Sequence, residues 1–203
     1  QHFCGGFIIT NRWVGCAAHC TINRTPATTF TVVGAHNRIT GGTTIPTARI
    51  VNHPGYVSST LANDASLVQT SQDIVFTALV AAIPIGSAHV DTHTGAVVSG
   101  WGQTSHPGSA AANLQFLHAN IITNADCRSR LSATQALRIG DSKICLLSPN
   151  GQGLCMGDSG GPLVANGAVH GIVSWGVPCG TAAPDMFCRV SHVHGWMTGV
   201  IAS

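Results

Sequence analysis

Short apolar segments recur along the chain, separated by glycine, proline, asparagine and serine. Runs that are rich in Val, Ile and Phe and bounded by such turn residues predict β-strands. The segments that fit this description are residues 7–10, 30–33, 49–51, 66–69, 96–99, 115–121, 162–164 and 168–175. Their close spacing favours an all-β fold, as a barrel or a sandwich.

One segment near the carboxyl end has a different period. Apolar residues there recur at intervals of three to four, the spacing of one face of an α-helix: Val190, Val193, Trp196 or Met197, and Val200 or Ile201. We expect a helix over residues 190–202 that packs its apolar face on the strands. The glycine- and serine-rich stretch 102–113 predicts an exposed loop.

Composition and charge support this class and exclude several functions. Charged residues are only 8% of the 203-residue chain, which has no glutamate and a single lysine, Lys143. The formal net charge is +2, and the basic residues are scattered rather than clustered. We therefore expect no nucleic-acid partner. No apolar run reaches the ~18 residues of a membrane-spanning helix, so we expect no membrane partner. Eight cysteines indicate an oxidising compartment and a secreted protein.

Candidate chemistry lies in the stretch GLCMGDSGGPL, residues 153–163, where Ser159 follows an aspartate among glycines. A serine hydroxyl is a weak nucleophile near neutral pH and needs an adjacent base that a third group orients. His19 lies upstream in AAHC, and Asp64 in LANDASL. Histidine, aspartate and serine therefore follow one another in that order along the chain.

Ordered motifs along the whole chain resemble the chymotrypsin family of serine proteases. They are AAHC at 17–20, NHPGY at 52–56, LANDASL at 61–67, SGWG at 99–102, CMGDSGGPL at 155–163, IVSWG at 172–176 and RV at 189–190. The resemblance implies two Greek-key antiparallel β-barrels followed by a C-terminal α-helix. Residues 1–90, whose first strand region is missing, would form the N-terminal barrel, and residues 91–203 the C-terminal one.

The resemblance also implies a catalytic triad. His19 would be the general base and acid, Asp64 would orient it, and Ser159 would attack the carbonyl. His19 and Asp64 are 45 residues apart, the usual family spacing, which favours Asp64 over Asp73. The backbone N–H groups of Gly157 and Ser159 would form the oxyanion hole.

The same resemblance describes a specificity pocket. Gly153 would form its floor, where trypsin-like members carry an aspartate that meets Lys or Arg. Asp185 stands where most relatives carry glycine, and the combination resembles brachyurin-type crustacean collagenases and certain insect chymotrypsins. We expect Asp185 to enter from the pocket wall, where burial raises its pKa; the alternative is that it turns outward to solvent. The inward position leaves room for Phe, Tyr or Leu and still offers a partner to Arg or Lys.

Other contacts are implied around this pocket. Ser174, Trp175 and Gly176 would form an extended edge to which the substrate backbone pairs, with Ser174 also close to Asp64. The remaining cleft residues make it mostly apolar: Met156 at the pocket mouth, Val177 at its rim and Leu61 on the neighbouring subsite.

The family's disulfide pairing accounts for six of the eight cysteines. It would join Cys4 to Cys20, Cys127 to Cys145, and Cys155 to Cys179. Cys16 and Cys188 are left over and would lie behind the catalytic aspartate, where the two barrels meet. Two alternatives stay open for them: a fourth disulfide between the barrels, or a pair of buried thiols.

The resemblance breaks at the amino end. Family members open with an Ile-Val-Gly-Gly type of sequence, whose freed ammonium pairs with the aspartate before the nucleophile, here Asp158. This chain begins too late to supply that group, so we expect Asp158 to turn toward His2 and the oxyanion hole to be unformed. An incompletely determined sequence is our favoured explanation, over a separate N-terminal piece or a truncated, inactive form.

The sequence thus predicts a secreted serine endopeptidase with a chymotrypsin-like to broad preference and a digestive role. Its partners would be protein or peptide substrates and proteinaceous inhibitors, and we expect a monomer. No cofactor and no metal are expected, because the histidine pairs of the chain lack completing ligands. A protein of another class, a catalytically silent homologue that binds partners through its surface, is the alternative. The presence of all three triad residues argues against it.

Overall fold

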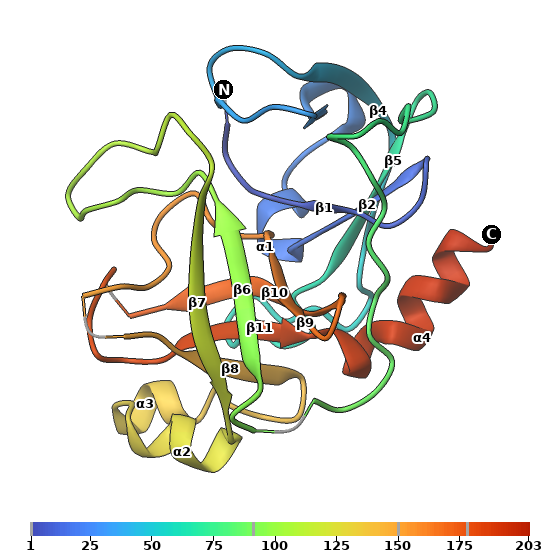
Figure 1. Ribbon diagram of the computed structural model, residues 1–203. Coiled ribbons are helices and arrows are strands. Elements are labelled where there is room, and N and C mark those ends of the chain that lie inside the picture. Colours follow the sequence, from blue (N-terminus) through green and yellow to red (C-terminus); the bar gives the residue numbers. More distant parts are fainter. Residues whose placement is uncertain (1, 91, 150, 178) are drawn as a thin grey trace.

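A computed structural model describes residues 2–90, 92–149, 151–177 and 179–203. Its strands form two groups that lie side by side (Figure 1). The first is an open five-stranded sheet in the order β1-β2-β5-β4-β3, and the second closes into a barrel in the order β10-β11-β8-β7-β6-β9. The predicted all-β class with two barrel-like sheets is confirmed, with the first sheet open between β1 and β3.

The first sheet holds the amino-terminal third of the chain. Its strands are β1 (Phe7–Ile8), β2 (Trp13–Cys16), β3 (Phe30–Val33), β4 (Thr43–Asn52) and β5 (Ser66–Thr70). All neighbouring strands are antiparallel. Between β2 and β3 lie two short helices, α1 (Ala18–Thr21) and the 3₁₀ helix η1 (Pro26–Thr28). Apolar side chains of the sheet form a core of its own: Val14, Val33, Ile45, Val68, Ile74 and Val80.

The barrel contains the remaining strands. They are β6 (Gly95–Gly100), β7 (Gln115–Ile122), β8 (Lys143–Leu147), β9 (Pro162–Ala165), β10 (Ala168–Gly176) and β11 (Asp185–Arg189). Two short helices, α2 (Asn124–Ser129) and α3 (Ala133–Ala136), connect β7 to β8. The division that the sequence predicted, between residues 90 and 91, falls between β5 and β6; residue 91 lies outside the described residues.

The terminal helix α4 (Val190–Ile201) confirms the predicted element and joins the two sheets. Its buried residues are Val190, Val193 and Met197, and Trp196, Val200 and Ile201 are partly buried against the same core. These side chains pack in one cluster with Leu67 of the first sheet and Ile172 of the barrel. Figure 1 shows α4 on the side of the molecule away from α2 and α3.

Three strands were absent from the predicted set: β2, β8 and β11. In β8 and β11 a charged residue stands at the first position, Lys143 and Asp185, and both are buried. A short apolar run that begins with a charged residue is less readily predicted as a buried strand, because charged side chains are almost never fully buried without a partner. The two exceptions both lie at the candidate site.

Candidate active site

Strand pairing brings His19 and Asp64 together. His19 lies in α1, directly after β2, and Asp64 precedes β5; β2 and β5 are paired, with Cys16 opposite Ser66. The ring Nδ1 of His19 is 2.7 Å from Asp64 Oδ2. The backbone N–H of His19 donates to the other carboxylate oxygen at 2.8 Å. The Asp64 side chain is fully buried, so these contacts fix the orientation of the imidazole.

Ser174 is the third donor to Asp64. Its hydroxyl donates to Oδ2 at 2.7 Å. The pairing of β10 with β11 shifts by one residue between Val173 and Trp175, so Ser174 is the extra residue of a β-bulge. A bulge redirects a side chain out of the regular alternation, which here turns the Ser174 hydroxyl toward Asp64. The expected proximity of Ser174 and Asp64 is thus present in the structure.

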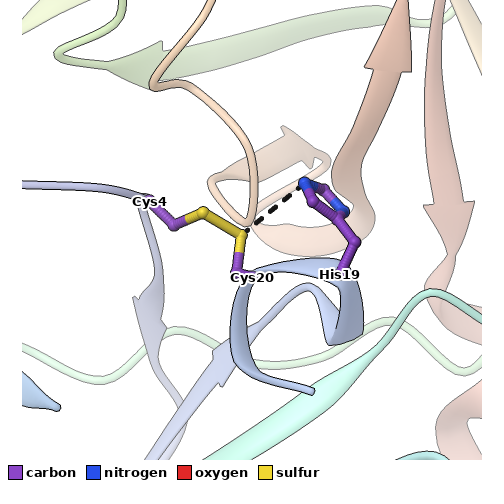
Figure 2. Close-up of side chains that lie close together, drawn as sticks. All are labelled: Cys4, His19 and Cys20. Carbon is purple, nitrogen blue, oxygen red and sulfur yellow. Dashed lines mark hydrogen bonds between the residues drawn. A yellow bond between two sulfur atoms is a disulfide. The ribbon is translucent and has the colours of Figure 1, made fainter. Parts of the chain in front are cut away.

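Ser159 is held close to the histidine segment through its backbone. Its carbonyl accepts from the N–H of Gly5 at 2.7 Å, and Cys4 is bonded to Cys20, the residue after His19. Figure 2 shows the His19 ring beside this disulfide, with Nε2 3.7 Å from Cys20 Sγ. Among the described residues, no hydrogen bond joins the Ser159 hydroxyl to His19. In unliganded proteases this contact is often long and tightens when substrate binds.

Two backbone donors beside Ser159 are free to bind an anion. Gly157 has a backbone φ of +101°, a conformation that residues other than glycine rarely adopt. Within the described part of the chain, the N–H groups of Gly157 and Ser159 donate to no protein acceptor. His2 contacts the same turn, with Nε2 2.9 Å from the Gly157 carbonyl oxygen.

The expectation that Asp158 turns toward His2 is wrong, because its carboxylate forms hydrogen bonds with backbone N–H groups and not with His2. Its carboxylate accepts from the N–H of Gly102 at 2.8 Å and from the N–H of Cys155 at 3.0 Å. The absence of side chains at Gly100 and Gly102 leaves the space that the carboxylate occupies. Burial raises the pKa of Asp158, and the two N–H donors and the nearby His2 oppose that rise.

Asp185 points into the molecule, so the solvent-facing alternative is wrong. Its side chain is 4% exposed, and Oδ2 accepts from the N–H of Leu154 at 3.1 Å. A Cβ on Gly153 would lie 3.3 Å from Oδ2, and one on Gly176 would lie 2.9 Å from Oδ1. The carboxyl group therefore lies between these two glycines. Burial raises its pKa to about 7; the charge of Asp158 adds to the rise and the Leu154 N–H opposes it.

The other predicted cleft residues differ in exposure. Met156 is 65% exposed, whereas Trp175, Val177 and Leu61 are partly buried. Asp73, the rejected alternative to Asp64, lies on the surface and pairs with Arg12 at 3.5 Å.

Sequence reasoning missed one residue of this site, Lys143. Its side chain is fully buried, and Nζ donates to Ser174 Oγ at 2.9 Å and to the carbonyl of Leu61 at 2.6 Å. The only signal in the sequence is its uniqueness, because no other lysine is present. From sequence alone a lysine is predicted to lie on the surface, because lysine is almost never fully buried unless it has a partner.

All three expected disulfides are present: Cys4–Cys20, Cys127–Cys145 and Cys155–Cys179. Of the two alternatives for Cys16 and Cys188, the structure has the buried thiols. The Cys16 sulfur donates to the Gly5 carbonyl at 3.3 Å, and the Cys188 sulfur faces the backbone N–H of Asp64. The two thiols therefore contact different backbone groups, one at Gly5 and one at Asp64.

This arrangement predicts the result of a thiol titration. Native protein should show no reactive thiol, because burial raises the pKa of both thiols to about 12 and closes access to reagent. Unfolding in guanidinium without reductant should release the two free cysteines. Reduction before the assay should raise the count to all eight, which serves as the control. A count of zero after unfolding would show that Cys16 and Cys188 are bridged.

Comparison with known proteins decides the family. The sequence profile described as "Trypsin" matches residues 1–197. The chain belongs to the trypsin family of serine proteases. "Trypsin" of Xenopus laevis is 38% identical over 208 residues, covering 100% of this chain and 82% of that protein. "Serine protease 1" of Rattus norvegicus is 37% identical over 210 residues, covering 100% and 81%. "Trypsin delta" of Drosophila erecta is 33% identical over 199 residues, covering 97% and 78%.

This trypsin-family chain is therefore a serine endopeptidase, and its substrates are proteins. The more specific likeness to brachyurins and insect chymotrypsins stays a prediction. In the part of the chain that the structure describes, no helix has both the length and the apolar character needed to cross a bilayer.

Proposed function

We propose that His19, Asp64 and Ser159 are the catalytic triad of this endopeptidase. The observation that carries the proposal is the buried Asp64 carboxylate, which accepts from both the backbone N–H and the ring Nδ1 of His19. With its proton on Nδ1, the imidazole has a free Nε2 lone pair, and this atom takes the Ser159 proton as Oγ attacks the substrate carbonyl. The N–H groups of Gly157 and Ser159 hold the resulting oxyanion.

The second half of the reaction uses the same groups. His19 returns the proton to the leaving amine, which leaves an acyl group on Ser159. A water molecule then loses a proton to His19 as its oxygen attacks the acyl carbonyl. The bond to Ser159 Oγ breaks, His19 returns the proton to that oxygen, and the carboxylic acid is released. The edge formed by Ser174, Trp175 and Gly176 would hold the substrate backbone as an added strand, with Leu61, Met156 and Val177 bordering the side-chain subsites.

For the residue before the scissile bond we propose a mixed preference. The floor at Gly153 carries no charge, which accommodates Phe, Tyr and Leu, as in chymotrypsin-like members. Asp185 supplies a carboxylate from the wall, which suits Arg and Lys and agrees with the trypsin names of the relatives. Because the pKa of Asp185 is raised to about 7, the carboxylate is half ionised near neutral pH.

We also propose that Asp158 is linked to activation. It borders a cavity of about 470 Å³ whose lining includes Gly102, Gly153 and Leu154. The raised pKa of this carboxyl is the expected sign of a buried acid that lacks a cationic partner. An ammonium group entering the cavity would pair with it, as the N-terminus does in family members. Secretion, a digestive role and a monomeric state complete the proposal, and the three disulfides support secretion.

The test is labelling with a fluorophosphonate, which reacts only with an activated serine. The full chain should acquire one adduct, mapped by peptide mass to Ser159. Ser159→Ala should acquire none, and His19→Ala should react at least 100-fold more slowly because no base takes the proton. Asp73→Asn, on the surface, should label like the wild type. Absence of an adduct on the wild-type chain would favour the catalytically silent homologue.

A further inference from the structure

A buried cation stands at the far end of the hydrogen-bonded row that leads to His19. Asp64 Oδ2 is bonded to the His19 ring on one side and to the Ser174 hydroxyl on the other. The Ser174 oxygen in turn accepts from Lys143 Nζ at 2.9 Å. Lys143 is among the largest side chains that are fully excluded from solvent in the described part of the chain. A buried lysine is costly unless its bonds compensate, so its contacts call for an explanation.

The first consequence concerns the direction of the hydrogen bonds. An ammonium group only donates, and a serine hydroxyl has one proton. With Lys143 as donor to Ser174 Oγ, the single Ser174 proton is directed to Asp64. Without Lys143 this hydroxyl could rotate to another acceptor, and Asp64 would lose one of the three bonds that hold it.

The second consequence concerns the loop that carries Asp64. Leu61 and Asn63 have φ of +57° and +52°, which is strained for residues other than glycine. Lys143 Nζ donates to the Leu61 carbonyl at 2.6 Å, and the Asn63 side chain donates to the Gly55 carbonyl at 2.8 Å. These two bonds hold the loop in the conformation that presents Asp64 to His19.

The third consequence is electrostatic, and it depends on which neighbouring groups carry charge. Cys188 lies opposite Lys143 in the β8–β11 pairing, and Cys16 interacts with Asp64. Burial raises the pKa of both thiols to about 12, so they are uncharged at working pH. Burial lowers the pKa of Lys143, while the charge of the Asp64 carboxylate opposes that change.

Two further groups face this space. Tyr56 interacts with Asp64; burial raises its pKa, the carboxylate adds to the rise, and the phenol stays neutral. Arg138 is a partly exposed cation whose charge adds to the lowering of the pKa of Lys143. The charges inside the protein around the row are therefore those of Lys143, Asp64 and, when protonated, His19.

We propose that Lys143 is a positioning residue of the catalytic row: it orients Ser174 against Asp64 and reduces the negative potential that the carboxylate exerts on His19. The inference rests on the proposed triad. The acidic limb of the pH–rate profile reports protonation of the general base, so it is the property that loss of this cation should change. Charges in the protein interior are screened less than exposed ones, so the ammonium group of Lys143 can act on His19 although Ser174 and Asp64 lie between them.

The test compares Lys143→Met with the wild type. The variant removes the charge and keeps the side-chain length, and exchange of a buried ion for an apolar residue is often tolerated. The rate constant kcat/KM is followed from pH 5 to 9 on a peptide amide with Leu before the scissile bond, so that Asp185 has no cation to bind. We expect the acidic limb to move to higher pH by about half to one unit. Arg130→Met, which removes an exposed cation from α2's C-cap, should leave the limb in place.

A second measurement needs no substitution. Because Lys143 is the only lysine, labelling with ¹⁵N-lysine gives one side-chain NMR signal. It should shift with the same midpoint as the His19 ring signals, since coupling between two sites is reciprocal. A flat Lys143 signal across that range, or an unchanged limb in Lys143→Met, would overturn the inference. Absence of both hydrolysis and fluorophosphonate labelling in the wild type would instead defeat the proposed function, and the NMR titration would still decide whether Lys143 and His19 are coupled.

Discussion

Replacing Asp64 with asparagine is expected to lower kcat/KM about 10⁴-fold near neutral pH, the loss that the same exchange causes in a well-studied member of this family. The size of the effect is not explained by lost charge alone. The geometry around Asp64 shows that the amide group has no orientation compatible with its neighbours.

Both carboxylate oxygens of Asp64 accept from donors. Oδ1 faces the His19 backbone N–H, and Oδ2 faces the His19 ring and the Ser174 hydroxyl. If the amide nitrogen of asparagine replaces Oδ1, it faces the backbone N–H of His19, another donor, and that hydrogen bond is lost. If it replaces Oδ2, it donates to Nδ1 of His19, and the ring proton moves to Nε2. An imidazole protonated on Nε2 cannot take the proton of Ser159.

Three measurements check this prediction. Steady-state kinetics should show the loss in kcat rather than in KM, because the substrate contacts remain. Thermal unfolding should show that the Asp64→Asn chain is folded, and Asp73→Asn, a surface exchange with the same change in charge, should keep wild-type rates. An Asp64→Asn enzyme within tenfold of the wild type would mean that Asp64 is not the residue that orients the catalytic histidine.

The sequence predicted those parts of the site that are carried by contiguous motifs. His19, Asp64 and Ser159 lie in AAHC, LANDASL and GDSGG. The pairing of β2 with β5, which joins the first two, was not predicted, because β2 was not among the predicted strands. The inward direction of Asp185 was also predicted, from the resemblance of the Gly153 and Asp185 combination to a subgroup of the family, and in the structure the carboxyl group lies between Gly153 and Gly176.

Most of the missed features depend on contacts between segments far apart in the chain. The bulge that turns Ser174 to Asp64 arises from the register of β10 against β11, which local sequence does not determine. Burial of Lys143 depends on acceptors that are 31 and 82 residues away. Likewise, Asp158 finds backbone donors at Gly102 and Cys155 rather than His2.

Replacing Asp185 with asparagine is expected to lower kcat/KM for substrates with Arg or Lys by roughly 100-fold at pH 8, because a buried cation loses its charged partner. Substrates with Leu or Phe should change by no more than about threefold, since their side chains pack on the apolar walls. Asp126→Asn, an exposed exchange in α2, should leave both classes unchanged. A peptide library cleaved equally after Arg by both enzymes would place Asp185 outside the pocket.

The pH dependence of this selectivity has a defined sign. Below the pKa of about 7 the Asp185 carboxyl is neutral and cannot pair with a cation. The ratio of kcat/KM for Arg over Leu substrates should therefore rise with pH through the neutral range in the wild type. In Asp185→Asn the ratio should stay flat, because an amide does not titrate.

Stability should change with pH in the opposite sense to that selectivity. A carboxyl whose pKa is raised in the folded state from 3.8 to about 7 contributes stability that is fully present below pH 3.8 and is lost as pH rises through 7. Above pH 8 the ionised group costs the wild type up to about 4 kcal/mol, a cost that asparagine does not carry. Thermal unfolding at pH 5 and pH 8.5 should show a larger loss of Tm for the wild type than for Asp185→Asn. Parallel losses in the two proteins would mean that the buried carboxyl has another partner in solution.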